Sequence, residues 1–488
     1  MEDEEFVCAA DRLQDLRSLV LDALSNDMST TACWYANKLV TMSKGNAEDV
    51  LLLARTYYAS GDFARTARAL ETHKAYGAEP LAQFRKGDSG DDAAVELRAR
   101  LLAARALAKC GRHADCVSTL EPAMADIETY EGVTQDDDDE EELDSPSSSS
   151  AHPVKVDLAA AACSVVGQAY EALENRSRAV EWLKRALELD PHCAEAVSFL
   201  VERRLLSSSD ESRLSSQLSR AVGKQNEWIG AVYGARLCVH PGLEPSSGRF
   251  EALDRVHGLG DNNEVLCARA EHCYYAHDSR SAHRLAKRVY NNDPFEFACV
   301  PVYLASMVEL KLSHELFYCA HELVKSYPKR AASWFAVGCY YLLVGKNDAA
   351  QRYFHKSAKT CPRFAPAWIG FGNAFAAQDE SEQAMAAYRS ASRLFQGSHV
   401  PLLFIGMEYL RTNNLPLAKH FLRGAKALCP STDPVVSNEL GVVELRQGNY
   451  HDAEETFLES LEPQSTATTS RDRVRPRAEA RARRQSPT

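Results

Sequence analysis

Small and large apolar positions recur along residues 331–461 at a step of 34 residues. In the first three steps an aromatic residue follows a glycine by three positions, and in all four a large apolar residue later follows an alanine by four. Residues three or four apart lie on one face of an α-helix, so each step predicts two amphipathic helices. The columns contain Gly338, Gly372, Gly406 and, one residue late, Gly441; then Tyr341, Phe375 and Tyr409; then Ala350, Ala384, Ala418 and Ala453; and last Phe354, Tyr388, Leu422 and Phe457.

The residue types in these columns indicate how the two helices pack. Glycine and alanine let antiparallel helices approach closely, and the aromatic residues fill the space between them. Gly345 and Gly448 fall at the bends, where a positive φ costs glycine nothing, and Pro362 and Pro430 end two of the steps. A 34-residue step of this kind is the tetratricopeptide pattern. The sequence therefore predicts an all-α tetratricopeptide-repeat superhelix.

The pattern is interrupted twice, which divides the chain into five segments. We expect a diverged N-terminal array, an acidic, serine-rich disordered insert, a central group of repeat-like helices, the strong C-terminal array and a disordered Arg-rich tail without a visible capping helix. These segments are residues 1–125, 126–155, 156–260, 261–462 and 463–488. The register is weakest between Ser207 and Gly260, where Ser207–Ser219 is polar and one helix is expected around Trp228.

Composition narrows the function classes. The net charge of −12 over 488 residues argues against a nucleic-acid or membrane-surface protein. No apolar run approaches the length that crosses a bilayer, and the acidic first residues argue against a signal peptide. The fourteen cysteines include no C-x2-C pair, so buried free thiols are favoured over disulfides or a zinc site.

Catalytic motifs are absent, and the nearest approach to a metal cluster is Cys267, His272, Cys273 and His277. Cys273 occupies a core column of its repeat, so we interpret this spacing as a coincidence of one helix face. The sequence predicts no enzyme activity, no metal and no cofactor.

Function is therefore expected on the surface, in the groove that the first helix of each repeat lines. The mixture of apolar, amide and arginine side chains suits an extended peptide, and about half of the candidates should be exposed. They are Tyr274, Phe335, Cys339, Leu342, Asn373, Met407, Arg411, Asn438 and Arg446.

Particular strings go beyond the generic repeat. The segments Met307–Pro328 and Ser333–Lys359, and the runs that begin at Ala365 and Pro401, closely resemble subunit 6 of the anaphase-promoting complex, the cell division cycle protein 16 family. The strings WYANKLV and NDPFEFACVPVYLA also fit, and the resemblance spans roughly residues 10–460.

The resemblance implies a non-catalytic scaffold of a cell-cycle ubiquitin ligase, in the nucleus and cytoplasm. It also implies a homodimer through the N-terminal repeats, with Trp34, Tyr57 and Phe63 in the dimerising half, and a very small accessory subunit in the C-terminal groove. Other tetratricopeptide subunits would stack on the outer surface. The alternative function is a stand-alone adaptor that binds peptide segments of partner proteins.

Overall fold

The computed structural model describes residues 2–71, 90–130, 157–223, 226–237, 246–429 and 433–461, and every regular element in these ranges is an α-helix. The chain divides into two compact units, Met1–Leu200 and Val201–Thr488, with the boundary inside one helix. The prediction of an all-α repeat fold is confirmed.

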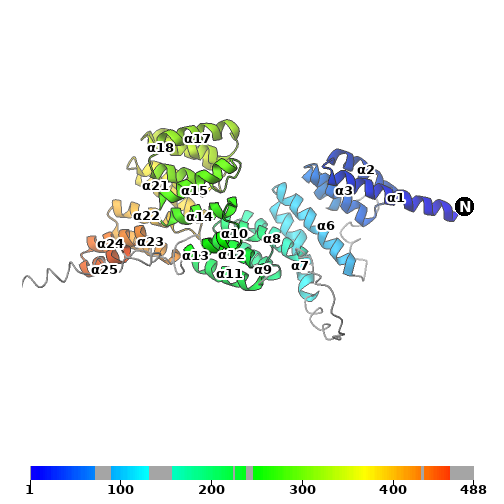
Figure 1. Ribbon diagram of the computed structural model, residues 1–488, viewed down its shortest axis with the longest axis horizontal. Helices are drawn as coiled ribbons and strands as arrows, with labels where there is room; N and C mark the ends of the chain where they lie inside the picture. Colours follow the sequence, from blue (N-terminus) through cyan, green and yellow to red (C-terminus); the bar gives the residue numbers. More distant parts are fainter. Residues whose placement is uncertain are drawn as a thin grey trace, which may run out of the picture. The chain divides into compact units, whose positions relative to one another are not determined.

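Helices of the first unit follow one another in antiparallel pairs (Figure 1). They are α1 (Glu2–Ser25), α2 (Ser29–Met42), α3 (Ala47–Ala59), α4 (Phe63–Glu71), α6 (Gly90–Lys109), α7 (His113–Tyr130), α8 (Leu158–Ala172), α9 (Arg176–Leu189) and α10 (Ala194–Glu202), which contains the boundary.

The second unit begins with three helices of less regular repeat and continues as six pairs, from α14/α15 to α24/α25. The helices are α11 (Ser208–Ala221), α12 (Glu227–Leu237), α13 (Ser246–Arg255), α14 (Asn263–Tyr275), α15 (Ser279–Asn292), α16 (Val300–Glu309), α17 (Ser313–Ser326), α18 (Ala331–Leu343), α19 (Asn347–Thr360), α20 (Ala365–Ala376), α21 (Ser381–Leu394), α22 (Val400–Arg411), α23 (Leu415–Leu428), α24 (Pro434–Gln447) and α25 (Tyr450–Leu461).

The glycine column and the large apolar column meet inside each pair. A Cβ built on Gly338 would lie 2.6 Å from Cδ1 of Phe354, sixteen residues later in the second helix. The same encounter recurs between Gly406 and Leu422 and between Gly441 and Phe457, each at 2.6 Å. Helices this close leave no room for a side chain at the crossing, so the columns identified in the sequence are packing partners.

A side-chain hydrogen bond and a backbone conformation also repeat from one pair to the next. The indole N–H of Trp334 donates to the carbonyl of Pro328 at 2.8 Å, and Trp368 donates to Pro362 in the same way one repeat later. The bend of each pair holds a residue with positive φ, and glycine occupies only two of these six positions. They are His277, Lys311, Gly345, Asp379, Asn413 and Gly448.

The structure differs from the sequence prediction at three places. The polar stretch after Ser207 is a helix, α11, because Leu214 and Leu218 are buried at helical spacing and the Ser207 side chain accepts a hydrogen bond from the N–H of Asp210. A further helix, α13, spans Ser246–Arg255, in addition to the one helix expected around Trp228. Helix α7 extends to Tyr130, past the expected start of the insert.

Two predicted segments lie outside the described residues. Most of the acidic insert and the whole Arg-rich tail belong to residues 131–156 and 462–488, so their predictions stay untested.

Candidate functional site

The first helices of successive repeats form the inner layer of the C-terminal array. Helix α14 contacts α16, α16 contacts α18, α18 contacts α20, and α22 contacts α24. The second helices pack against the first helix of their own repeat and of the next one. Because the first helices lie closest to one another, their free faces line the concave side of the array, where the sequence places the groove.

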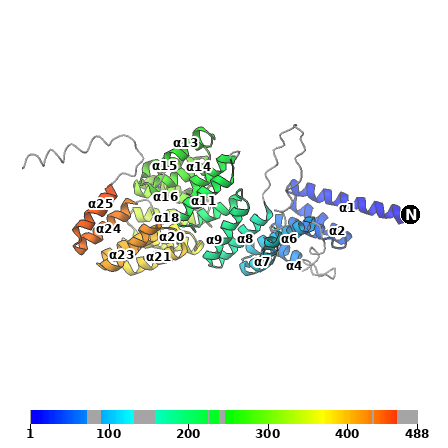
Figure 2. The same ribbon diagram turned by 90° about the horizontal axis from the view of Figure 1, so that it is seen from below.

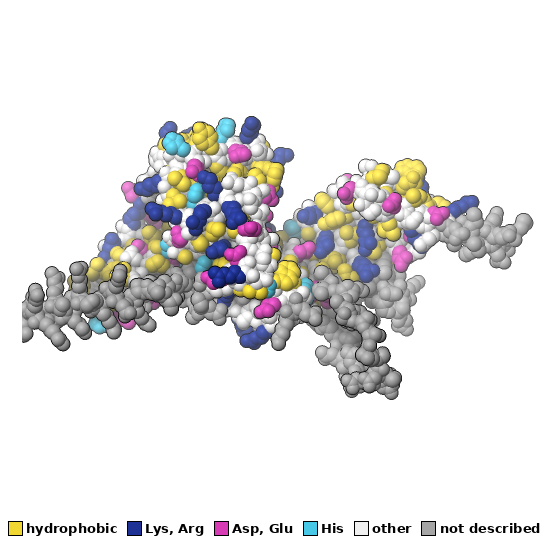
Figure 3. Space-filling model, viewed as in Figure 1, with side chains coloured by type: hydrophobic (Ala, Val, Ile, Leu, Met, Phe, Trp, Pro, Cys, Tyr) yellow, Lys and Arg dark blue, Asp and Glu magenta, His cyan; other side chains and the backbone are white. Residues whose placement is uncertain are grey.

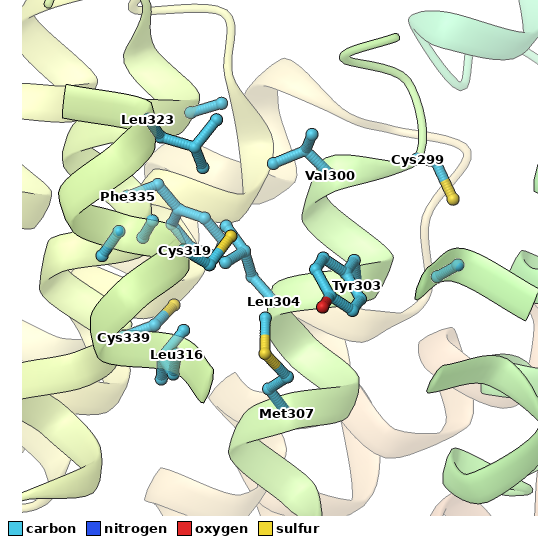
Figure 4. Packing of buried hydrophobic residues seen from close by; sticks show 14 of the residues in the cluster. Cys299, Val300, Tyr303, Leu304, Met307, Leu316, Cys319, Leu323, Phe335 and Cys339 are labelled. Atoms are coloured by element: carbon cyan, nitrogen blue, oxygen red, sulfur yellow. The ribbon is translucent and has the colours of Figure 1, made fainter. Parts of the chain in front are cut away.

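Phe335 and Cys339 are not groove residues, and that prediction is wrong. They are 6% and 5% exposed and belong to the hydrophobic cluster that joins α16, α17 and α18. Figure 4 shows both side chains directed into this cluster, toward Cys319 and Leu316. The ring of Phe335 contacts Phe354 in the second helix of its own repeat and Phe364 just before the next repeat, so it is enclosed within the array.

Arg411 and Arg446 connect successive repeats. The Arg411 guanidinium donates to the carbonyl of Ala376, at the C-terminal end of the preceding first helix, and to Asp379, Ser381 and Glu408, all at 2.7–2.8 Å. Arg446 donates in the same way to the carbonyl of Leu410 at 2.7 Å. A cation that binds carbonyls at a helix C-terminus also interacts favourably with the helix dipole. Both arginines therefore fix the repeat geometry while remaining at the surface.

Four further candidates are half-buried beneath the groove surface, namely Tyr274, Leu342, Asn373 and Met407. The amide oxygen of Asn373 accepts a hydrogen bond from the hydroxyl of Tyr388 at 2.6 Å. Burial, with Glu309 nearby, raises the pKa of Tyr274 well above its usual range, so its hydroxyl stays a neutral donor. Asn438 is exposed on α24 and donates a hydrogen bond to the neighbouring Glu439 at 3.3 Å.

Asp433, which the sequence did not indicate as a site residue, connects the last repeat of this unit to the α14–α15 bend. Asp433, the residue before α24, lies 3.0 Å from Nε2 of His399 and 3.1 Å from Nε2 of His277. His277 is in the α14–α15 bend, 156 residues earlier, and Figure 2 shows α24 and α25 returning beside that part of the array. Despite the opposing effect of burial, hydrogen bonds from the two imidazoles hold the pKa of Asp433 well below its usual range. The same contact raises the pKa of His277.

Part of this signal is present in the sequence. His399 and Asp433 stand 34 residues apart, at the N-cap position of successive first helices. The contact with His277 depends on the superhelical pitch, which the repeat pattern does not specify.

The cysteine–histidine group does not converge. Cys267 is buried in the hydrophobic cluster, whereas His277 faces Asp433. Within the described residues, no three or more His, Cys, Asp or Glu side chains are arranged to hold a metal ion. No helix in the described part is long and apolar enough to span a bilayer.

The three residues of the N-terminal half have different environments. Trp34 is 59% exposed on α2, and the ammonium of Lys38 lies 3.4 Å from the centre of its ring. Tyr57 is a core residue that donates a hydrogen bond to Asn37 at 3.1 Å, so it is not available to a second copy. Phe63 is half-buried against Tyr58.

Comparison with known proteins identifies the family. Residues 160–193 match the tetratricopeptide repeat family. Anaphase-promoting complex subunit 6 of Arabidopsis thaliana is 34% identical over 92% of this chain and 80% of its own length. The chain belongs to the anaphase-promoting complex subunit 6 family. The human cell division cycle protein 16 homolog, also 34% identical, is covered over 69% of its length.

A solved structure agrees with this membership. The anaphase-promoting complex hetero-tetramer Cut9–Hcn1 contains a chain that is 28% identical to this one, with a TM-score of 0.72. The match covers 95% of this chain and 82% of that chain. This member of the subunit 6 family is a tetratricopeptide scaffold subunit of the anaphase-promoting complex, so the alternative of a stand-alone adaptor is not supported.

Proposed function

We propose that this scaffold subunit holds an extended segment of a very small accessory subunit on the inner face of its C-terminal array. The observation that carries the proposal is the closure of unit 2, in which Asp433 and His277 bring the end of the array back to its beginning. A closed array surrounds a segment on several sides, and extended peptides are bound in this way by side-chain pockets and backbone hydrogen bonds. The similarity to a chain of the Cut9–Hcn1 hetero-tetramer supports a second kind of subunit as the occupant.

The groove has a direct test. Asn438→Trp places bulk on the inner face at an exposed position, so it should leave the fold intact and weaken binding of the small accessory subunit. Gln383→Trp, at an exposed position of the second helix α21, is the matched control and should bind normally. Equal affinities of the two variants in a calorimetric titration would exclude the inner face as the binding site.

The second part of the proposal is a homodimer through the N-terminal repeats. Large apolar side chains are exposed along α1 and α2, at Leu21, Met28, Trp34 and Met42. Trp34 and Met42 are eight residues apart and share one face of α2 with Lys38. Figure 3 shows hydrophobic side chains gathered on this end of the unit. An exposed apolar patch of this kind is typical of a protein interface, and a hetero-tetramer fits two copies of each of two chains.

Size-exclusion chromatography with light scattering tests the dimer. The chain alone should elute at about twice 54.0 kDa and gain mass when the small accessory subunit is added. Trp34→Asp should give a monomer, whereas Trp228→Asp, at an exposed tryptophan of the second unit, should remain dimeric. A monomeric wild-type chain, or a dimeric Trp34→Asp variant, would contradict this part.

The absence of catalysis and the location in the cell are proposals of the same kind. The subunit acts without catalysis, since the relatives are scaffold subunits and the described residues bring together no catalytic constellation. We place it in the nucleus and cytoplasm, and fluorescence microscopy of the tagged chain through the cell cycle tests that placement.

A further inference from the structure

Two contacts between distant segments close unit 2, and together they form what we name the closure seam. Arg204, Leu206 and His277 lie on one side, and Gly397, His399 and Asp433 lie on the other. The first contact is the His277–Asp433 pair. The second is a backbone hydrogen bond from the N–H of Gly397 to the carbonyl of Arg204 at 3.2 Å.

The second contact is tight because position 397 carries no side chain. A Cβ there would lie 2.2 Å from the carbonyl oxygen of Leu206 and 2.6 Å from that of Arg204. Both neighbours are backbone atoms and cannot move aside cheaply. The α10–α11 loop and the α21–α22 loop therefore touch through their main chains.

The first contact is accessible to water. The side chain of His277 is 45% exposed and that of Asp433 is 12% exposed, whereas His399 is 3% exposed. The His399–Asp433 pair links successive repeats inside the protein, and His277 completes the arrangement from the solvent side. Loss of the His277 contact thus removes one of the two contacts of the seam and no contact between neighbouring repeats.

His277 lies in the left-handed backbone region, which non-glycine residues adopt rarely. Its φ is 59°, and the equivalent bends hold glycine at Gly345 and Gly448 and a non-glycine residue at the other three positions. A non-glycine residue in the left-handed region costs free energy, and such a residue persists where the surrounding structure holds it. In this bend the imidazole forms a hydrogen bond with the carboxylate of Asp433, 156 residues away in the chain.

We propose that the closure seam is the gate of the inner groove, with His277 as the positioning residue that latches it through Asp433. A segment held inside a closed turn leaves when the ends of the turn separate, so the latch sets how long an occupant stays. This inference rests on the proposed groove function.

Charged groups around the latch give it a pH dependence. His277 faces Asp433 and Glu309, and Asp433 faces both imidazoles. On the Arg204 side, Glu211 is buried near Arg204, Glu271 and Asp210, and burial raises its pKa to about 7. The raised pKa of His277 means that the closed latch takes up a proton, so the seam should be tighter at pH 6 than at pH 8.

The test compares His277→Gly with Lys311→Gly in the full chain. Both positions are bends with positive φ, so glycine removes backbone strain at each, but only the first substitution removes a seam contact. Hydrogen exchange of the Gly397 amide, without any partner, should accelerate about five- to tenfold in His277→Gly, the loss expected for one hydrogen bond of ordinary net strength at a partly exposed site. Lys311→Gly should stay within about twofold of the wild type.

Dissociation of the fluorescently labelled small accessory subunit supplies the second readout. It should be about five- to tenfold faster from His277→Gly and unchanged in Lys311→Gly, and the wild type should release it more slowly at pH 6 than at pH 8. Unchanged exchange at Gly397 in His277→Gly would overturn the latch. Faster exchange with unchanged dissociation would overturn the gate. A wild type that binds no accessory subunit would refute the proposed function and the gate with it, while the exchange result would still decide whether the latch exists.

Discussion

Gly372 and Tyr388 are in contact across a helix pair that has no space for a methyl group. A Cβ on Gly372 would lie 2.3 Å from Cε1 of Tyr388, which is itself 1% exposed. The same pair of columns is separated by sixteen residues in the repeats at Gly338, Gly406 and Gly441, and in the first unit at Gly167 and Leu183. One crossing geometry is therefore repeated along the chain.

Gly338→Leu should destabilise the array by roughly 1–3 kcal/mol, the usual range for overpacking. The new side chain would meet the ring of Phe354, which is fully buried and cannot rotate into solvent. Gly248→Ala is the control, because this exposed helical glycine has no atom within 4 Å of the added Cβ. Urea unfolding followed by circular dichroism measures both, and an unchanged midpoint for Gly338→Leu would refute the packing of these columns.

The sequence predicts packing within a repeat much better than packing between repeats. The pairing of Gly338 with Phe354 and the bends at Gly345 and Gly448 follow from residue type and spacing, because both depend on contacts between helices that are adjacent in the chain. Phe335 is expected on the groove from its repeat position, but it packs against Phe354 of its own repeat and Phe364 before the next, in a cluster that also includes residues of α16. Packing between repeats depends on the small rotation from each repeat to the next, and the residue type at one repeat position does not determine that rotation.

The same limit applies to the polar residues of the site. Arg411 and Arg446 were interpreted as partner contacts, since arginine on an exposed face is typical of a binding surface. Their acceptors include backbone carbonyls at the C-terminal ends of α20 and α22, and no residue type marks such carbonyls in the sequence. The contact of Asp433 with His277 depends on the pitch of the whole array and could not be predicted from spacing.

Arg411→Ala should lower the free energy of unfolding by about 1–3 kcal/mol, because it removes three hydrogen bonds to the preceding repeat and one to Glu408 within α22; two of the four acceptors are carboxylates. Arg411→Lys should recover little of this loss. The planar guanidinium donates to acceptors on two sides at once, and a single ammonium group cannot reach all of them. Arg352→Ala, on the exposed side of α19, is the control and should change stability by less than about 0.5 kcal/mol. Equal losses in Arg411→Ala and Arg352→Ala would show that the arginine does not fix the repeats.

Cys110 and Cys116 should differ sharply in reactivity although they are six residues apart. Cys110 is exposed at the α6–α7 bend, whereas Cys116 is fully buried on α7, and burial raises its pKa to about 11. Since the thiolate is the nucleophile, a thiol reagent at pH 8 should modify Cys110 in the native protein and spare Cys116 until the chain unfolds. Mass spectrometry after proteolysis reads both sites, and early modification of Cys116 would contradict the packing of α7.

Stability should fall as the pH rises from about 5 to 8, and Glu211 should cause much of the change. Burial raises the pKa of Glu211 from 4.5 to about 7, so the folded chain keeps a proton that the unfolded chain releases between these values. The contribution is present below pH 4.5 and is lost as the pH rises through 7, a difference on the order of 3 kcal/mol. Glu211→Gln cannot ionise, so its melting temperature should depend less on pH than that of the wild type. Glu382→Gln, exposed on α21, should retain the wild-type dependence. If the melting temperatures of Glu211→Gln and the wild type changed with pH in the same way, Glu211 would be shown to ionise freely in the folded protein.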